Sequence, residues 1–117
     1  MKRDRLSALG QQVAVADEHL RFLLDEIERY IPHATVWVFG SRITGSQRRT
    51  SDLDLAVHCD KESAKKDLPR LNEVFIESDL PFKVQILDYN RLPENMQGNI
   101  KEKYAVLYQP RKSQERE

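Results

Sequence analysis

The sequence has few of the features that mark secreted or membrane proteins. Cys59 is the single cysteine among 117 residues, so no intrachain disulfide can form. Behind the basic N-terminus no apolar run is long enough for a signal peptide, and no stretch approaches the length of a membrane span. The sequence therefore predicts a cytoplasmic protein that does not cross a membrane.

The chain also lacks an excess of charge of either sign. Its 19 lysine and arginine residues balance 19 aspartate and glutamate residues. Zero net charge gives no electrostatic reason to expect a nucleic-acid partner, and no known nucleic-acid-binding motif is present. Hydrophobic residues make up 39% and charged residues 32%, which is typical of a globular protein. We expect one folded domain over residues 1–109 and a flexible polar tail over 110–117.

Helical periodicity predicts three helices. Apolar residues recur at helical spacing within residues 20–30, and this helix ends before Pro32, which cannot continue it. Residues 6–15 either extend the same helix or form a separate one. A second helix is expected to begin at Asp67, which can cap it, with a proline in its first turn. A third helix follows Pro93.

Runs of β-branched and aromatic residues predict the strands. The strands are expected at residues 35–39, 53–59, 82–87 and 105–108. Together with the helices, this order predicts a small mixed β-sheet with helices packed against it, in the α/β or α+β class.

Two aspartates at the start of the second predicted strand are candidate metal ligands. Asp52 and Asp54 leave the same face of a strand, because strand side chains alternate. Neighbouring carboxylates repel each other unless a cation lies between them. Mg²⁺ commonly takes one or two carboxylates together with substrate phosphates. The alternative is a solvated strand end or a turn cap, both of which aspartate favours.

A glycine–serine pair ends the first predicted strand, and ten residues separate it from these aspartates. Gly40 lets the backbone approach a ligand closely, and Ser41, if it opens a short helix, directs N–H groups and a hydroxyl at a phosphate. Arg42 could bond phosphate oxygens, and Arg48 and Arg49 could do so from the loop. A plain turn with a helix cap is the alternative for the pair, and a solvated basic turn for the two loop arginines. The combination predicts metal-assisted attack on the α-phosphate of a nucleotide, with pyrophosphate leaving.

These residues resemble the signature of the DNA polymerase β-like nucleotidyltransferase superfamily. Phe39-Gly40-Ser41-Arg42 followed by Ser51-Asp52-Leu53-Asp54-Leu55 is similar to its minimal nucleotidyltransferase branch. The strong match covers residues 35–57, and a weaker one covers 80–107. The resemblance implies a nucleotidyltransferase fold that binds a nucleoside triphosphate, ATP first of all, together with Mg²⁺ or Mn²⁺.

The resemblance also implies a partner. Members of this branch are mostly prokaryotic and often pair with a HEPN-domain protein as toxin and antitoxin. There the nucleotidyltransferase can transfer AMP from ATP to a tyrosine of the toxin, so we expect a hydroxyl acceptor on such a partner. An exposed apolar helix face would also permit a homodimer.

The sequence departs from the family pattern at Gln85. The family uses a third carboxylate on a later strand, and the matching position, within Val84-Gln85-Ile86, carries an uncharged amide that binds Mg²⁺ poorly. Asp88 lies on the opposite face of a regular strand, so we do not expect it to substitute. The resemblance assigns the third carboxylate to metal binding and to activation of the attacking hydroxyl, so catalysis should be weakened. The alternative is a catalytically impaired, nucleotide-binding antitoxin that neutralises its partner by contact.

Overall fold

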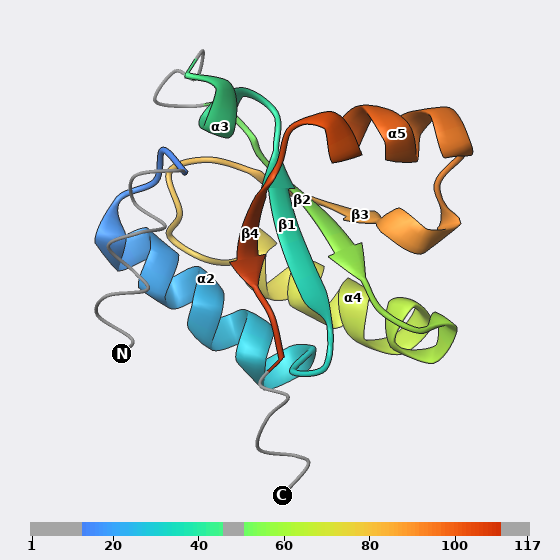
Figure 1. The fold of residues 1–117 in the computed structure, drawn as a ribbon. Helices are drawn as coiled ribbons and strands as arrows, with labels where there is room; N and C mark the ends of the chain where they lie inside the picture. Colours follow the sequence, from blue (N-terminus) through green and yellow to red (C-terminus); the bar gives the residue numbers. More distant parts are fainter. Residues whose placement is uncertain (1–12, 46–50, 111–117) are drawn as a thin grey trace, which may run out of the picture.

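A four-stranded sheet with the strand order β3-β2-β1-β4 forms the centre of the protein (Figure 1). The computed structural model describes residues 13–45 and 51–110. The strands are β1 (Thr35–Phe39), β2 (Leu53–His58), β3 (Val84–Asp88) and β4 (Ala105–Tyr108). β1 pairs antiparallel with β2 and β4, whereas β2 and β3 are parallel. The predicted mixed sheet is therefore confirmed, and the strand bounds differ from the prediction by at most two residues.

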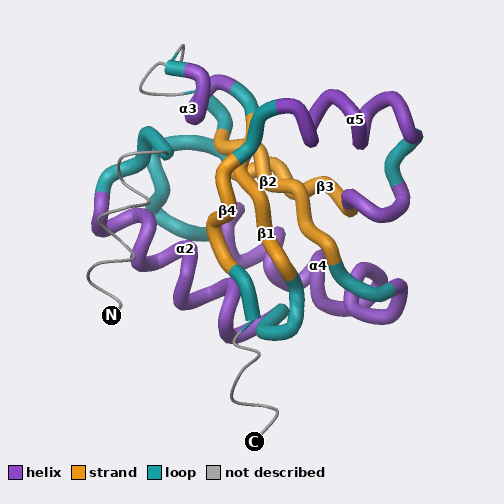
Figure 2. The backbone as a smooth tube through the Cα atoms, in the orientation of Figure 1, coloured by secondary structure: helices purple, strands orange, loops and turns teal. Residues whose placement is uncertain are grey.

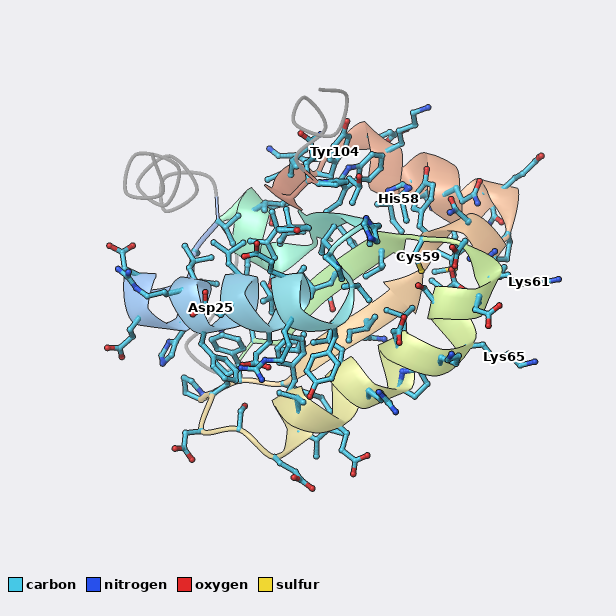
Figure 3. The ribbon with its side chains drawn as sticks, turned by 90° about the horizontal axis from the view of Figure 1, so that it is seen from below. Asp25, His58, Cys59, Lys61, Lys65 and Tyr104 are labelled. Carbon is cyan, nitrogen blue, oxygen red and sulfur yellow. The ribbon has the colours of Figure 1, made fainter. Side chains whose placement is uncertain are left out.

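Helices cover both faces of this sheet. They are α2 (Asp17–Tyr30), α3 (Ser41–Thr44), α4 (Lys61–Ile76) and α5 (Glu94–Glu102), with the short 3-10 helix η1 (Tyr89–Arg91) after β3. Figure 2 shows how these helices surround the strands. Seen from below, α2 and α4 lie side by side against one face, and α5 lies beyond the sheet (Figure 3). No helix in the described part of the chain is long and apolar enough to cross a membrane.

The main hydrophobic core lies between the sheet and the pair α2 and α4. Alternate residues of the strands point into it, as the period of a strand requires. Burying one such aliphatic side chain contributes about 1.5–3 kcal/mol. The fully buried members include Leu20, Leu23 and Ile27 from α2, Leu71 from α4, and Val36, Val38, Leu53, Leu55 and Val57 from the strands.

The opposite face of the sheet carries a smaller cluster. Ala56, Tyr89 and Ile100 are buried there. Trp37 extends the cluster and stacks on Tyr104 with 3.7 Å between the ring centroids. Because β2 residues alternate, the positions that share this face with Ala56 are the candidate site residues rather than core residues.

The first helix ends where the sequence predicts. α2 ends at Tyr30, where the predicted helix ends. Residues 13–16 are not helical, so α2 does not extend back through them. The remainder of the 6–15 segment lies outside the described residues, as does the predicted tail apart from Pro110, and the domain boundary stays a prediction.

The predicted start of the second helix is wrong. α4 begins at Lys61, and the Asp60 side chain caps it by accepting a 2.8 Å hydrogen bond from the Ser63 N–H. Asp67 lies inside the helix and accepts a bond from the Ser63 hydroxyl, and Pro69 lies beyond the first turn. The first turn of α4 is polar, so it lacks the apolar periodicity from which a helix start is inferred.

Replacing Asp60 with alanine should lower the free energy of unfolding by about 1 kcal/mol, because the cap of α4 is lost. Asp67→Ala should cost clearly less. Urea unfolding followed by circular dichroism measures both variants. An equal loss in the two variants would contradict the assignment of Asp60 as the cap.

Candidate active site

The candidate site lies at the end of the sheet where β1 ends and β2 begins, beside α3 (Figure 1). Phe39, the last residue of β1, is directly paired with Asp54 of β2. The chain then turns at Gly40 into α3, which begins at Ser41, ends at Thr44 and has Gly45 as its C-cap. The antiparallel register therefore brings the glycine–serine pair next to the aspartates, although the sequence separates them.

Gly40 and Asp54 are in close contact. The φ angle of Gly40 is 89°, a left-handed conformation that side chains disfavour. A Cβ at this position would overlap the Oδ2 atom of Asp54. The corner after β1 therefore needs glycine for its backbone conformation and also for the space that the Asp54 carboxylate occupies.

The electrostatics of the aspartates fit a cation. Asp54 is partly buried and Asp52 is exposed. Burial raises the pKa of the Asp54 carboxyl group, and the negative charge of Asp52 raises it further. Both effects mean that a second negative charge is unfavourable at this place without a counterion.

A divalent cation is the group that the donor set fits. In residues 13–45 and 51–110, no three histidine, cysteine, aspartate or glutamate side chains converge on one point. A metal here would accordingly be held by Asp52 and Asp54, with further oxygen ligands from a bound substrate. Hard carboxylate oxygens and an incomplete protein shell are typical of Mg²⁺ sites.

The third position of the family pattern also lies at this site. Gln85 is the direct partner of Asp54 in the parallel pairing of β2 with β3, so the two side chains share a face. Gln85 is exposed and therefore accessible. Asp88 is paired with the core residue Val57 of β2 and accepts a 2.5 Å hydrogen bond from Arg91. That it does not replace the missing carboxylate stays a prediction.

Arg42 has partners other than the phosphate that the sequence suggested. Its side chain is only 6% exposed. It donates hydrogen bonds to the carbonyl oxygens of Ala14 and Ser51 and lies over the ring of Phe82. Ala14 and Phe82 lie far from Arg42 in the sequence, and Ser51 lies nine residues away. No local sequence pattern predicts these contacts. The two loop arginines, 48 and 49, lie outside the described residues.

A groove of about 870 Å³ opens beside the site. It runs between α4 and β3, and Asp52 and Gln85 contribute to its lining. Its α4 wall is uncharged and includes Leu68, Asn72 and Ile76, three residues at helical spacing. The sequence reasoning missed this groove, although Ile76, which is 70% exposed, is an apolar residue at a position open to solvent.

Comparison with known proteins decides the family. The family model described as "Polymerase beta, Nucleotidyltransferase" matches residues 24–113, most of the chain. The chain belongs to the polymerase beta nucleotidyltransferase family. The matched segment contains the glycine–serine corner, both aspartates and Gln85.

Individual relatives agree with this family. The chain is 34% identical over 105 residues to a protein of Haemophilus influenzae described as "Probable protein adenylyltransferase MntA", covering 90% of this chain and 92% of the relative. The fold is similar to a crystal structure of a toxin-antitoxin with AMP-PNP, with a TM-score of 0.61, 21% identity, and coverage of 82% of this chain and 77% of that chain. A second solved chain, described as a nucleotidyltransferase, matches with a TM-score of 0.52 and 19% identity over 77% of this chain and 98% of its own. These two structures confirm the nucleotidyltransferase fold.

Gly40→Ala should destabilise the protein and disturb the Asp54 carboxylate. Gly45→Ala is the control for a positive φ, because Gly45 has a φ of 85° but nothing within 4 Å of an added Cβ. Alanine at Gly45, where ψ is 5°, carries backbone strain of roughly 1–2 kcal/mol. Gly40 has a ψ of −158°, in a region that essentially only glycine adopts, so its backbone strain is larger and adds to the overlap with Asp54. Only Gly40→Ala should show an additional loss of stability, measured by urea unfolding. Equal losses would mean that the contact with Asp54 is not limiting.

Asp54→Asn should raise the melting temperature of the metal-free protein at neutral pH. The pKa of Asp54 in the folded state lies above its ordinary value, so wild-type stability falls as the pH rises through that folded-state pKa. Asparagine does not titrate. Its advantage over the wild type should therefore be absent below about pH 4 and reach its full size at neutral pH.

Thermal melts of both proteins in chelator between pH 3.5 and 7.5 measure this difference. An Asp54→Asn advantage that is constant across the range would contradict the assignment. A variant that is less stable than the wild type at neutral pH would contradict it as well.

Proposed function

We propose that this protein is a metal-dependent adenylyltransferase that transfers AMP from ATP to a hydroxyl group of a protein partner. The observation that carries the proposal is the Asp54 carboxylate packed against Gly40, with Asp52 close enough to raise its pKa. The description of the Haemophilus influenzae relative supports a protein acceptor. The toxin-antitoxin structure with AMP-PNP, an ATP analogue, supports ATP and a toxin partner. A tyrosine of a HEPN-domain toxin is the acceptor implied by the sequence resemblance.

Each residue has a role in this proposal. Gly40 and Ser41 would bind the triphosphate at the start of α3, and Asp52 and Asp54 would hold Mg²⁺ or Mn²⁺. A bound divalent cation would offset the negative charge of the phosphates. In the transfer, the acceptor oxygen forms a bond to the α-phosphorus, the bond to pyrophosphate breaks, and the hydroxyl proton is lost to a base. Gln85 has no carboxylate to take that proton, so we expect slow transfer.

The groove between α4 and β3 supports an acceptor that is part of a larger molecule. It shares Asp52 and Gln85 with the site, so a chain segment lying in it would come close to both. Its uncharged α4 wall and the exposed Ile76 suit an apolar polypeptide surface better than a small polar acceptor. We place the acceptor segment of the partner in this groove.

A second candidate function is an antitoxin that binds nucleotide but neutralises its partner by contact alone. The exposed amide at position 85, next to Asp54, favours this candidate. A homodimer stays a prediction. The exposed large hydrophobic residues of the described chain, Ile76, Met96 and Tyr104, lie in different segments and not along one helix.

Wild-type protein should bind Mg²⁺–ATP or Mn²⁺–ATP, and the Asp52→Ala/Asp54→Ala double variant should not. Isothermal titration calorimetry measures this binding. With α-labelled ATP and the partner protein, the wild type should leave labelled AMP on the partner. A partner that is inhibited without acquiring label would favour the contact-only antitoxin, and equal binding by the wild type and the double variant would exclude this nucleotide site.

Gln85→Asp should increase the rate of AMP transfer at least tenfold, because general-base catalysis contributes roughly 10²–10⁴-fold. Gln85→Asn is the matched control, since asparagine has the shape of aspartate without its charge. Single-turnover transfer of label measures the three proteins. An equal rate in all three would show that position 85 does not take the place of the third carboxylate.

A further inference from the structure

Arg42 connects four segments that are distant in the sequence. Its Nη1 donates to the carbonyl oxygen of Ala14 at 2.6 Å, and the Ala14 N–H donates back to the Arg42 carbonyl at 2.8 Å. Its Nε and Nη2 both donate to the carbonyl oxygen of Ser51, at 3.2 and 2.8 Å. The guanidinium carbon lies 4.3 Å from the centre of the Phe82 ring, in the segment before β3.

The bond to Ser51 matters because the next residue is Asp52. The pairing of β2 with β1 reaches only to Asp54, and the pairing with β3 begins at Leu53. Asp52 thus precedes both ladders and is exposed. The two hydrogen bonds from Arg42 hold the carbonyl group of Ser51, which belongs to the peptide bond between Ser51 and Asp52. The strand pairings do not hold this peptide bond.

Burial and geometry argue against a phosphate-binding role for this guanidinium. A group that is 6% exposed has little surface left for a ligand. Arginine is the side chain that can make this contact, because its planar fork carries several N–H donors in fixed directions, whereas lysine carries one compact ammonium. Breaking the contact would leave the part-buried Ser51 carbonyl oxygen without these two donors.

We propose that Arg42 is a positioning residue of the metal site: its guanidinium holds the Ser51 carbonyl and thereby places Asp52 beside Asp54 for a divalent cation. This inference rests on the proposed function, since it requires that the two aspartates bind a cation. It differs from a phosphate contact in a measurable way. Loss of a positioning residue weakens cation binding even without nucleotide, whereas loss of a phosphate ligand weakens only nucleotide binding.

The test is Mn²⁺ binding in the absence of nucleotide, followed by the electron paramagnetic resonance of free Mn²⁺. Wild type, Arg42→Lys and the Asp52→Ala/Asp54→Ala double variant are compared well below their melting temperatures. Arg42→Lys keeps the charge but not the fork, and should weaken Mn²⁺ binding at least tenfold. Ile27→Val is the control for general destabilisation, because Ile27 lies in the core on the other face of the sheet, and it should bind Mn²⁺ like the wild type.

Phe82→Leu provides a second variant that does not depend on the fold surviving loss of the guanidinium. It removes the aromatic ring under Arg42 but leaves the hydrogen bonds, so Mn²⁺ binding should weaken by two- to fivefold. Arg42→Lys binding Mn²⁺ within twofold of the wild type would overturn the inference. If Arg42→Lys does not fold, unchanged Mn²⁺ binding by Phe82→Leu would overturn it.

The same titration separates this inference from the proposed function. If the wild type binds Mn²⁺ no better than the double aspartate variant, both without and with ATP, the proposed metal site fails and the role of Arg42 fails with it. If the wild type binds Mn²⁺ better than the double aspartate variant and Arg42→Lys binds it as well as the wild type, the metal site stands and Arg42 is not its positioning residue. Normal Mn²⁺ binding with a selective loss of ATP affinity in Arg42→Lys would return Arg42 to the phosphate role.

Discussion

The contact between the Asp54 carboxylate and the backbone of Gly40 is the constraint on which the candidate site depends. It exists because β1 and β2 pair with Phe39 opposite Asp54, which leaves the next residue of the chain directly against the carboxylate. No side chain can stand at that corner without displacing the acid. The strand register, the left-handed turn and the start of α3 at Ser41 are therefore parts of one arrangement.

The two faces of the sheet carry different kinds of residue. The face toward α2 and α4 is apolar and holds the main core. The other face carries the smaller cluster of Ala56, Tyr89 and Ile100, and Asp54 lies on this face because it alternates along β2 with Ala56. Burial raises the pKa of Asp54 there, which means that the metal-free fold tolerates an unfavourable charge. The core and the candidate site thus use different residues of the same strands.

The parts of the fold that follow from local chemistry could be predicted from the sequence. The strand 35–39 is β-branched and aromatic, and the pairing of Gly40-Ser41 with Asp52 and Asp54 has a spacing specific enough to indicate the family, which the family match confirms. The start of α4 could not be predicted, because its first turn is polar and solvated. The partners of Arg42 could not be predicted either. Every residue carries a backbone carbonyl oxygen, so residue type does not indicate which carbonyl accepts a hydrogen bond. That Gln85 lies directly beside Asp54 follows only from the parallel pairing of β2 with β3, which the structure shows.

The position of β3 at the edge of the sheet affects how freely residue 85 can change. Gln85 lies on the outermost strand, is open to solvent and supports no part of the core. Exchanging its side chain leaves the packing of the molecule as it is. Under the proposed function, selection can therefore adjust the rate of AMP transfer through this one position while the fold stays intact, and a lineage can change between modifying a partner and only binding it without first evolving a new protein.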